Sequence, residues 1–331
     1  MIRHKVIVAA AVAAIALTGC SQQAATPEET GLTEVTQIKF VGVPLAEFAP
    51  IWAAQEQGFF TEENLEVTID PTAAASSAEA AALLVSGEYQ LAMGSVATIA
   101  QGTTQGLDLV VVSGASVVGG KDDVSQQILS RADGPGDLKE LAQPGNVIAV
   151  SAINSPTMVY VKNAIAQAGG DPNAPQYQAA PSPTIEELIM NGSVQGGALL
   201  NPFLAAAEAN PDIQVIGSAS GALPEGTPAV SVIASRPYVD ANPEVFDAVR
   251  RAIQKGVDWV SDPENRDAVN ELIVTYTGQD PEIVAGLTLP TYSTVLTTES
   301  VENLLKLFVK YDALDAVLAA DEVVDPAALS E

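Results

Sequence analysis

The chain has 331 residues, of which 47% are hydrophobic and 5% aromatic, and this length is enough for two ordinary domains with cores of their own. Its formal net charge is −27 at pH 7, which argues against nucleic-acid binding because that function needs a basic surface. The acidic surface otherwise indicates only solubility.

The N-terminus has the pattern of an export signal. A basic start, "MIRHK", precedes the apolar run "VIVAAAVAAIALTGC", which is too short to span a bilayer and predicts a secretory signal peptide over residues 1–19. The ending "LTGC" matches the lipobox of bacterial lipoproteins, and the alternative is a plain signal peptide with an incidental Cys20. Residues 20–34 have linker composition. We therefore expect a body held at the extracytoplasmic face of the cell membrane by a lipid on Cys20.

Histidine and cysteine are confined to this export segment, since His4 and Cys20 are the only residues of their types. The exported body then has no imidazole or free thiol, which excludes Ser-His-Asp and Cys-His catalysis and zinc sites of the Cys/His type. Carboxylate-only chemistry stays open, but the pairs Glu62-Glu63 and Glu186-Glu187 look like exposed charges. No phosphate-binding or dinucleotide-binding glycine motif is present, so we expect no cofactor and no metal.

From Val35 onward, predicted strands alternate with predicted helices. The strands are 35–43, 65–69, 89–93 and 107–114, and the helices between them are 49–58, 77–87 and 94–106. The strand segments are apolar throughout, which is typical of a parallel sheet covered on both faces.

The alternation restarts further along the chain. A short helix at 137–143 and a strand at 147–150 precede a long helix, for which Ser155 is the predicted cap and Pro156 the first residue. A helix at 183–192, a strand at 197–200, a helix from residue 201 and two strands within 213–235 follow. From Asn242 the chain is mostly helical, and three Asn-Pro or Asp-Pro pairs (242–243, 262–263 and 280–281) mark helix starts.

Two segments share one pattern. "LLVSGEYQLAMGS" and "LIMNGSVQGGALLNP" each have a helix end, a Gly, a Gln three residues later and a small apolar strand. The two glutamines are Gln90 and Gln195. This repetition favours two related halves, and we predict a two-lobe α/β protein.

Four places end a strand and start a helix with small or polar residues: 44–50, 94–98, 153–157 and 201–203. Ligands of open α/β sheets bind where such helix starts gather, and free backbone N–H groups there suit an anion or a carbonyl oxygen. Ordinary capping explains each corner singly, whereas four together predict a ligand held between two lobes. The candidate ligand-binding residues are Leu45, Glu47, Phe48, Trp52, Gly94, Ser95, Ser113, Asn154, Ser155, Thr157, Asn201 and Phe203.

Three of these candidates have an ordinary structural interpretation that stays open. Trp52 is either a core residue or a stacking platform for a ligand. Glu47 is either a first-turn helix acid or a side chain that faces the crevice, where it would favour a cation or an N–H donor. Phe203 either lies against a ligand or packs in the core.

The order of these segments resembles the solute-binding lipoproteins of ABC importers of the nitrate, sulfonate and taurine type, a group that also binds thiamine-pyrimidine precursors. The matching segments are "APIWAAQEQGFFTEENLEVTI", "LLVSGEYQLAMGSVATIAQGTTQGLDLVVV", "DLKELAQPGNVIAVSAINSPT", "NGSVQGGALLNPFLAAAEA" and "ASRPYVDANPEVFDAVRRAIQKGVDWV". The resemblance implies a type II periplasmic-binding-protein fold, each lobe a mostly parallel sheet flanked by helices. We assign 35–115 and 225–331 to lobe 1 and 116–224 to lobe 2.

The resemblance also implies partners and site residues. The partners are a small-molecule ligand, a membrane permease and its cytoplasmic ATPase, and we expect a monomer that does not bind nucleic acid. Ser95, Ser155, Thr157 and Asn201 stand where that family binds its ligand.

The chain departs from the family pattern at three positions. The family often has Asp where this chain has Gln90 and Gln195, and often an acidic residue where it has Asn201. The resemblance therefore does not choose between nitrate, sulfonate and pyrimidine. The four corners contain no Arg, which disfavours a dianion and leaves a monoanion or a neutral heterocycle.

Two other functions stay open beside the binding protein. One is an extracytoplasmic enzyme that uses carboxylates, and the other is a sensor subunit that presents its ligand without transport. A thiamine-pyrimidine synthase of the same fold needs His and Cys residues that this chain lacks in its exported part. The leading expectation is a substrate-binding lipoprotein rather than an enzyme.

Overall fold

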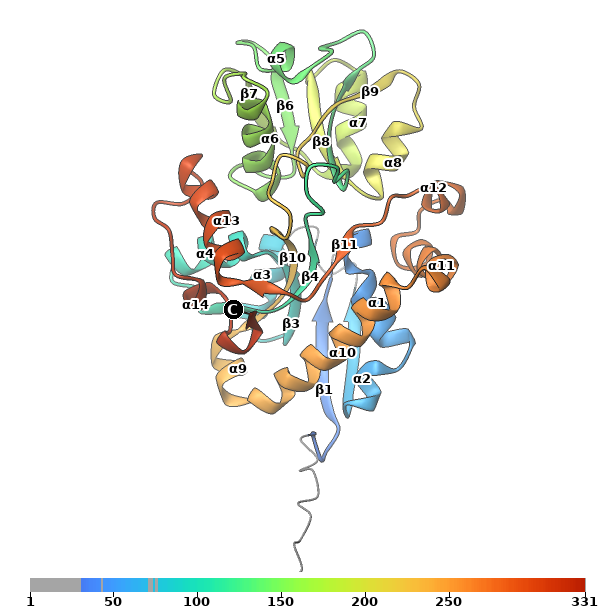
Figure 1. Cartoon of the computed structure of the whole chain (residues 1–331), viewed down its shortest axis with the longest axis vertical. Coiled ribbons are helices and arrows are strands. Elements are labelled where there is room, and N and C mark those ends of the chain that lie inside the picture. Colours follow the sequence, from blue (N-terminus) through green and yellow to red (C-terminus); the bar gives the residue numbers. More distant parts are fainter. Residues whose placement is uncertain (1–30, 43, 71–73, 75–76, 331) are drawn as a thin grey trace, which may run out of the picture. The chain divides into compact units, whose positions relative to one another are not determined.

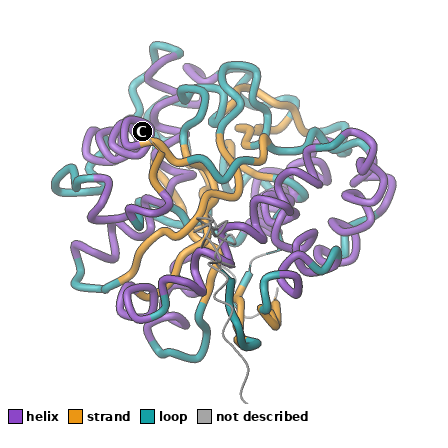
Figure 2. The backbone as a smooth tube through the Cα atoms, turned by 60° about the horizontal axis from the view of Figure 1, so that its bottom comes forward, coloured by secondary structure: helices purple, strands orange, loops and turns teal. Residues whose placement is uncertain are grey.

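The computed structural model describes residues 31–42, 44–70, 74 and 77–330. The predicted signal peptide (1–19), Cys20 and the linker up to residue 30 lie outside the described residues, as does Val43 at the end of the first predicted strand. From residue 31 onward the chain forms one unit. Its strands build two larger sheets, with helices on the outside of the strands (Figures 1 and 2).

The first sheet is buried on both faces at β3 and β4, whereas β1 and β2 at its edge alternate between buried and exposed residues. Its strands are β1 (Thr36–Val41), β2 (Leu65–Asp70), β3 (Leu91–Gly94), β4 (Leu109–Val117), β10 (Pro228–Ser235) and β11 (Thr291–Tyr292), in the order β11-β4-β10-β3-β1-β2. Val110 and Val112 of β4 belong to one hydrophobic cluster, whereas Val111 belongs to another. Successive side chains of a strand point to opposite faces, so each face of this sheet contributes to a separate core.

Helices from both ends of the chain cover this sheet. They are α1 (Ala49–Glu56), α2 (Phe59–Glu62), α3 (Ser77–Val85), α4 (Val96–Thr104), α9 (Arg236–Ala241), α10 (Pro243–Ser261), α11 (Arg266–Thr277), α12 (Pro281–Ala285), α13 (Thr298–Lys310) and α14 (Ala320–Val323). Helix α10 packs so closely on α1 that a Cβ at Gly256 would overlap the carbonyl oxygen of Pro50. Among the described residues, none of the helices combines the length and apolar character needed to cross a membrane.

The second sheet belongs to the middle of the chain. Its strands are β5 (Gln126–Arg131), β6 (Val147–Val150), β7 (Gln176–Ala179), β8 (Gly196–Leu200) and β9 (Ile213–Ser218), in the order β7-β6-β8-β5-β9. The helices around it are α5 (Leu138–Leu141), α6 (Pro156–Gln167), α7 (Ser182–Met190) and α8 (Phe203–Glu208). Leu129 packs with the cluster of Ile185 and Leu204, whereas Ile128 belongs to the larger cluster on the other face.

The chain crosses between the sheets twice, after β4 and before β10 (Figure 1). The strand that follows each crossing is antiparallel to its neighbours: β5 to β8 and β9, and β10 to β3 and β4. Within the described residues, four strands of each sheet still run in one direction. The α/β fold class is confirmed, but the sheets are mixed. A strand that arrives from the other sheet does not pass through the helical crossover that makes neighbours parallel.

The predicted helix starts are confirmed where a side chain caps the helix. The Ser155 hydroxyl accepts from the Met158 N–H at 3.4 Å, ahead of α6. The Ser95 hydroxyl accepts from the Thr98 N–H at 3.1 Å, ahead of α4. Asp280 also caps the helix that follows it, α12.

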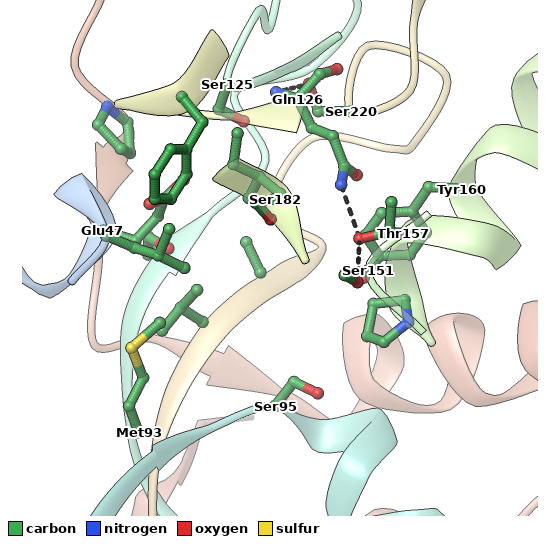
Figure 3. A pocket seen from close by; sticks show the side chains of 18 of the residues that line it. Glu47, Met93, Ser95, Ser125, Gln126, Ser151, Thr157, Tyr160, Ser182 and Ser220 are labelled. Atoms are coloured by element: carbon green, nitrogen blue, oxygen red, sulfur yellow. Dashed lines mark hydrogen bonds between the residues drawn. The ribbon is translucent and has the colours of Figure 1, made fainter. Parts of the chain in front are cut away.

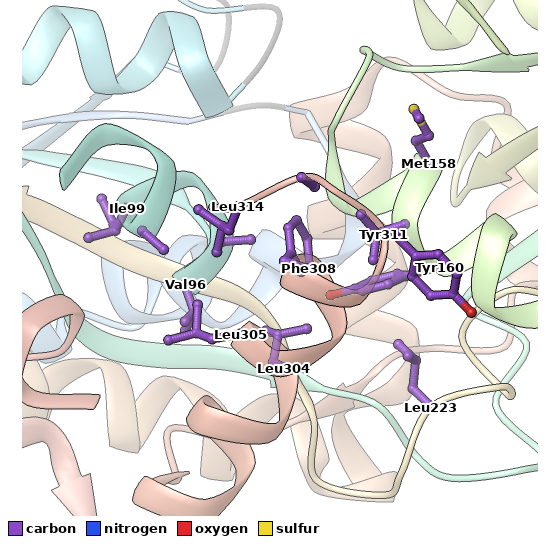
Figure 4. Packing of buried hydrophobic residues seen from close by; sticks show 14 of the residues in the cluster. Val96, Ile99, Met158, Tyr160, Leu223, Leu304, Leu305, Phe308, Tyr311 and Leu314 are labelled. Atoms are coloured by element: carbon purple, nitrogen blue, oxygen red, sulfur yellow. The ribbon is translucent and has the colours of Figure 1, made fainter. Parts of the chain in front are cut away.

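The two halves share a hydrophobic contact on the side of α13 (Figure 4). Phe308 of α13 packs edge-on against Tyr160 of α6, with ring centroids 6.4 Å apart. The Gln101 side-chain amide of α4 donates to the carbonyl oxygens of Asn154 at 2.8 Å and Ala313 at 3.2 Å. These contacts hold the start of α6 against the first half of the molecule.

Candidate functional site

A cavity of about 490 Å³ lies between the two sheets, and both contribute to its wall. One part is lined by Met93 and Gly94 at the end of β3, by Val117 at the end of β4, and by Val118 directly after it. The starts of α6, α7 and α8 line another part. The volume is within the range of small-molecule sites, and the position beyond strand ends is where α/β sheets bind ligands.

All four predicted corners contribute to the wall of this cavity. Of the twelve candidate residues, six line it: Leu45, Glu47, Gly94, Ser95, Thr157 and Phe203. The corners are more than 150 residues apart at their extremes in the sequence, and the structure brings them to one place.

The other six candidates lie outside the cavity wall. Phe48 and Trp52 are fully buried in the core, where Trp52 stacks on Tyr276 with ring centroids 4.8 Å apart. The buried Ser113 hydroxyl donates to the Gly114 carbonyl at 2.8 Å. Ser155 caps α6.

Asn154 and Asn201 also make contacts away from the cavity. The Asn154 carbonyl accepts from Gln101, and its backbone has a φ of 59°. Asn201 is 3% exposed, and its amide nitrogen lies 3.4 Å from the Thr288 carbonyl oxygen. Its amide oxygen has no hydrogen-bond partner in the part of the chain that the structure describes.

Several lining residues were not among the sequence candidates. They are Met93, Ser116, Ser125, Gln126, Ser151, Tyr160, Ser182 and Ser220. Ser182 begins α7 directly after β7, so it occupies a fifth strand-to-helix corner. The sequence signal for that corner was weak because "QYQA" is too polar to predict a strand.

Hydroxyl and amide groups form a connected network on one side of the cavity (Figure 3). The Gln126 side-chain amide donates to the Thr157 hydroxyl at 3.0 Å, and the Ser151 hydroxyl donates to the same oxygen at 3.2 Å. The Gln126 backbone N–H donates to the Ser220 hydroxyl at 3.2 Å. Thr157 therefore accepts from two side chains, which leaves its own O–H free to donate toward a ligand.

Glu47 lies on the other side of the cavity, away from Thr157 and Tyr160 (Figure 3). Glu47 is 2% exposed, and neither of its carboxylate oxygens has a hydrogen-bond partner among the described residues. The pKa of Glu47 is raised from 4.5 to about 8, mainly because the carboxyl group is buried. The backbone amide of Glu47 partly offsets this rise, and the negative charge of Asp123 adds to it. A carboxyl group with this pKa is mainly the neutral acid at pH 7.

The described part of the cavity wall contains no Lys, Arg or His. Its larger apolar side chains include Leu45, Met93, Tyr160, Leu200 and Phe203. Within the described residues there is also no group of three or more His, Cys, Asp or Glu side chains that would hold a metal ion. The site thus offers hydroxyls, apolar surface and one buried carboxyl group.

Comparisons with known proteins agree with this architecture. Residues 31–274 match the model of the NMT1-like family. No curated protein matches the sequence.

Solved structures of binding proteins have the same fold. The periplasmic aliphatic sulphonate-binding protein SsuA from Escherichia coli is 16% identical, with a TM-score of 0.70 over 88% of this chain and 98% of that one. The periplasmic nitrate-binding protein NrtA from Synechocystis PCC 6803 is 14% identical, with a TM-score of 0.73 over 89% and 87%. A zinc-bound ligand-binding component of an ABC-type import system from Staphylococcus aureus is 14% identical, with a TM-score of 0.72 over 88% and 97%. The periplasmic-binding-protein fold is confirmed.

Proposed function

Because the chain belongs to the NMT1-like family, we propose that it is the solute-binding component of an ABC importer. It holds one small organic molecule in the cavity between the two sheets and delivers it to a membrane permease that works with a cytoplasmic ATPase. The observation that carries the proposal is the 490 Å³ cavity whose wall comes from both sheets. A ligand that contacts both halves stabilises the arrangement that contains it, and this is the property a delivery protein needs.

The size of the cavity favours an organic solute over a small inorganic anion. A volume of about 490 Å³ lies within the roughly 300–1,000 Å³ of pockets that bind small organic molecules. Nitrate, with four non-hydrogen atoms, would leave most of that space unfilled. The apolar wall supports the same choice, because Met93, Leu200 and Phe203 offer contact surface that a small anion does not use.

The composition of the wall favours binding over catalysis. Glycoside hydrolysis and related chemistry use two facing carboxyl groups, whereas Glu47 is the only carboxylate side chain of the described wall. Asp123 is engaged elsewhere, since it accepts from the backbone N–H groups of Gly119 and Ser125. This arrangement supports the role of a binder without turnover.

We also propose that a lipid on Cys20 holds the protein at the extracytoplasmic face of the cell membrane. The support is the "LTGC" ending of the signal segment. A Cys20→Ser variant is expected to lose incorporation of an alkyne-labelled fatty acid and to leave the membrane fraction. Labelling that persists in this variant would contradict the anchor.

The transport role is tested by binding and uptake together. A thermal-shift screen at millimolar concentration with nitrate, taurine, alkanesulfonates, pyrimidines and organic amines is expected to reveal stabilisation by one class. Saturation at 100 times Kd corresponds to about 2.7 kcal/mol of stabilisation. Cells that lack the gene are then expected to lose uptake of the binding compound. Chemical turnover of that compound by the purified protein, or stabilisation by none of the classes, would refute the proposal.

A ligand-presenting sensor would bind a compound without affecting its uptake, so the same experiment separates the two roles. Light scattering is expected to show a monomer both with and without the compound.

A further inference from the structure

The cavity wall contains one buried carboxyl group, that of Glu47, to which the described residues give no hydrogen bond. Glu47 belongs to the short 3-10 helix Ala46–Phe48 that precedes α1. Glu47 is 2% exposed, and both of its carboxylate oxygens lack a hydrogen-bond partner among the described residues. Burying a carboxyl group in this way costs free energy whether it is charged or neutral.

The charged groups around Glu47 do not supply the missing partner. Asp123 is negative and opposes ionisation of Glu47. Tyr292 donates its hydroxyl hydrogen to the Ala46 carbonyl at 3.0 Å rather than to the carboxylate. The positive charge of Arg266 lowers the pKa of Tyr292, against the larger effect of burial, which raises it. The Arg266 guanidinium donates its hydrogen bond to the Leu287 carbonyl. An incoming ligand is thus the natural source of a donor for Glu47.

The apolar side of the wall indicates the rest of the ligand. Met93, Leu45 and Phe203 line the cavity together with Glu47, while Thr157 and Ser151 lie on the far side (Figure 3). A molecule that fills the space therefore has a donor at one end, an apolar body and a hydrogen-bonding or apolar group at the other end.

Resting on the proposed function, we propose that Glu47 is the specificity-determining residue of the cavity and selects an organic ligand that presents a protonated nitrogen. Glu47 and the ligand then form a charge-assisted hydrogen bond inside the closed wall. An oxoanion fits less well, because the described wall has no Lys, Arg or His and Glu47 faces the same space. The inferred ligand class therefore differs from the sulphonate and nitrate that the structural neighbours bind.

A neutral Glu47 offers the main competing explanation, since its O–H can donate one hydrogen bond to an anion. The substitution Glu47→Gln separates the two cases. Gln keeps an N–H donor for an anion but removes the negative charge that a cation needs, and it changes the side-chain volume very little. Loss of cation binding with retention of anion binding is therefore specific to the proposed role.

The experiment uses three probes with one apolar body: 2-phenylethylamine, 2-phenylethanol and 2-phenylethanesulfonate. Binding to the full chain in detergent is measured by calorimetry for the wild type, Glu47→Gln and the matched control Glu88→Gln, whose side chain is exposed. The wild type is expected to favour the amine over the sulfonate by at least about tenfold. Glu47→Gln is expected to lose about tenfold to a hundredfold in amine affinity and to keep or improve sulfonate affinity.

The ratio of amine to sulfonate affinity is the deciding readout, because it does not depend on the fraction of the variant that is folded. An unchanged ratio in Glu47→Gln, or a wild type that binds the sulfonate as tightly as the amine, would overturn the inference. The control Glu88→Gln is expected to leave the ratio unchanged. If the inference about Glu47 is overturned in this way, the proposed function stays intact. If no compound of the wider screen stabilises the protein, the proposed function is overturned as well.

The same pairing predicts proton release on binding. The amine is protonated at pH 6 and pH 8. The carboxyl group of Glu47, before the amine binds, is mostly neutral below about pH 8. Amine affinity is therefore expected to rise by about tenfold per pH unit from pH 6 toward pH 8 and to level off above it. Affinity that stays constant across this interval would contradict the ion pair.

Discussion

The burial of Glu47 makes the stability of the empty protein depend on pH in a direction opposite to that of most carboxylates. Its pKa is about 8 in the folded state, against 4.5 for an ordinary glutamate. The folded state therefore binds the proton more tightly than the unfolded state. This contribution to stability is fully present below pH 4.5 and is lost as the pH rises toward 8.

The size of the effect follows from the two pKa values. Between pH 5 and pH 8 the unfolded glutamate ionises almost completely, while the folded one is about half ionised at the upper end. The linkage relation then gives a loss on the order of 3 kcal/mol over this interval. The Glu47→Gln variant cannot ionise, so it is expected to gain that amount relative to the wild type between the two pH values.

Urea denaturation at pH 5, 6, 7 and 8 measures this difference. The wild type and Glu47→Gln share all other ionisable groups, so subtracting their free energies of unfolding removes the effect of the net charge of −27. Glu88→Gln serves as the control, because its exposed carboxyl group is expected to give a flat difference. A flat difference for Glu47→Gln as well would show that Glu47 is ionised and solvated in the folded protein, and would refute the reasoning.

Three further predictions concern packing and the polar network. Gly256→Ala is expected to cost about 1–3 kcal/mol, because its Cβ meets the backbone of Pro50, and an unchanged urea midpoint would contradict this. Phe308→Ala removes a fully buried ring beside Tyr160 and is expected to cost about 3–5 kcal/mol; a loss below 1 kcal/mol in urea denaturation would place the ring outside the core. Thr157→Val removes the acceptor of two side-chain hydrogen bonds and is expected to lower stability by about 1–3 kcal/mol, whereas an equal or higher thermal midpoint would contradict the network.

The sequence by itself determined those helices and strands whose signals come from residues next to one another in the chain. The strand at 147–150 has the predicted bounds, and the helix capped by Ser155 begins at the predicted Pro156. An apolar run, a hydroxyl cap and a Pro in the first turn are properties of neighbouring residues. The same local signals located the four corners that contribute to the cavity wall.

Two strands of the second sheet, β5 and β7, escaped prediction because their surroundings, and not their composition, make them strands. β7 is an edge strand with mostly exposed side chains, so it lacks an apolar pattern. β5 contains the polar Gln126 and Ser130, which are buried through hydrogen bonds to Thr157 and to the Pro135 carbonyl. The antiparallel position of β5 arises only when the chain crosses between the sheets, and the edge position of β7 only when the second sheet assembles.

The sequence also did not determine the direction of side chains on a mostly buried helix. Six of the eight residues of α1 are buried, so its pattern does not indicate which face meets the cavity. The structure directs Trp52 onto Tyr276, inside the core. Tyr276 belongs to α11, which packs on α1 together with α10, so helices from a distant part of the chain surround α1.

Glu47 shows most clearly where sequence reasoning ends. Its position at a helix start is a local fact, and the sequence left open whether it faces solvent or the crevice. Tertiary structure decides that the side chain is buried in a cavity whose wall comes from both sheets. A carboxyl group acquires its charge state from the solvent and partners that surround it, and those are set only when distant segments have packed together.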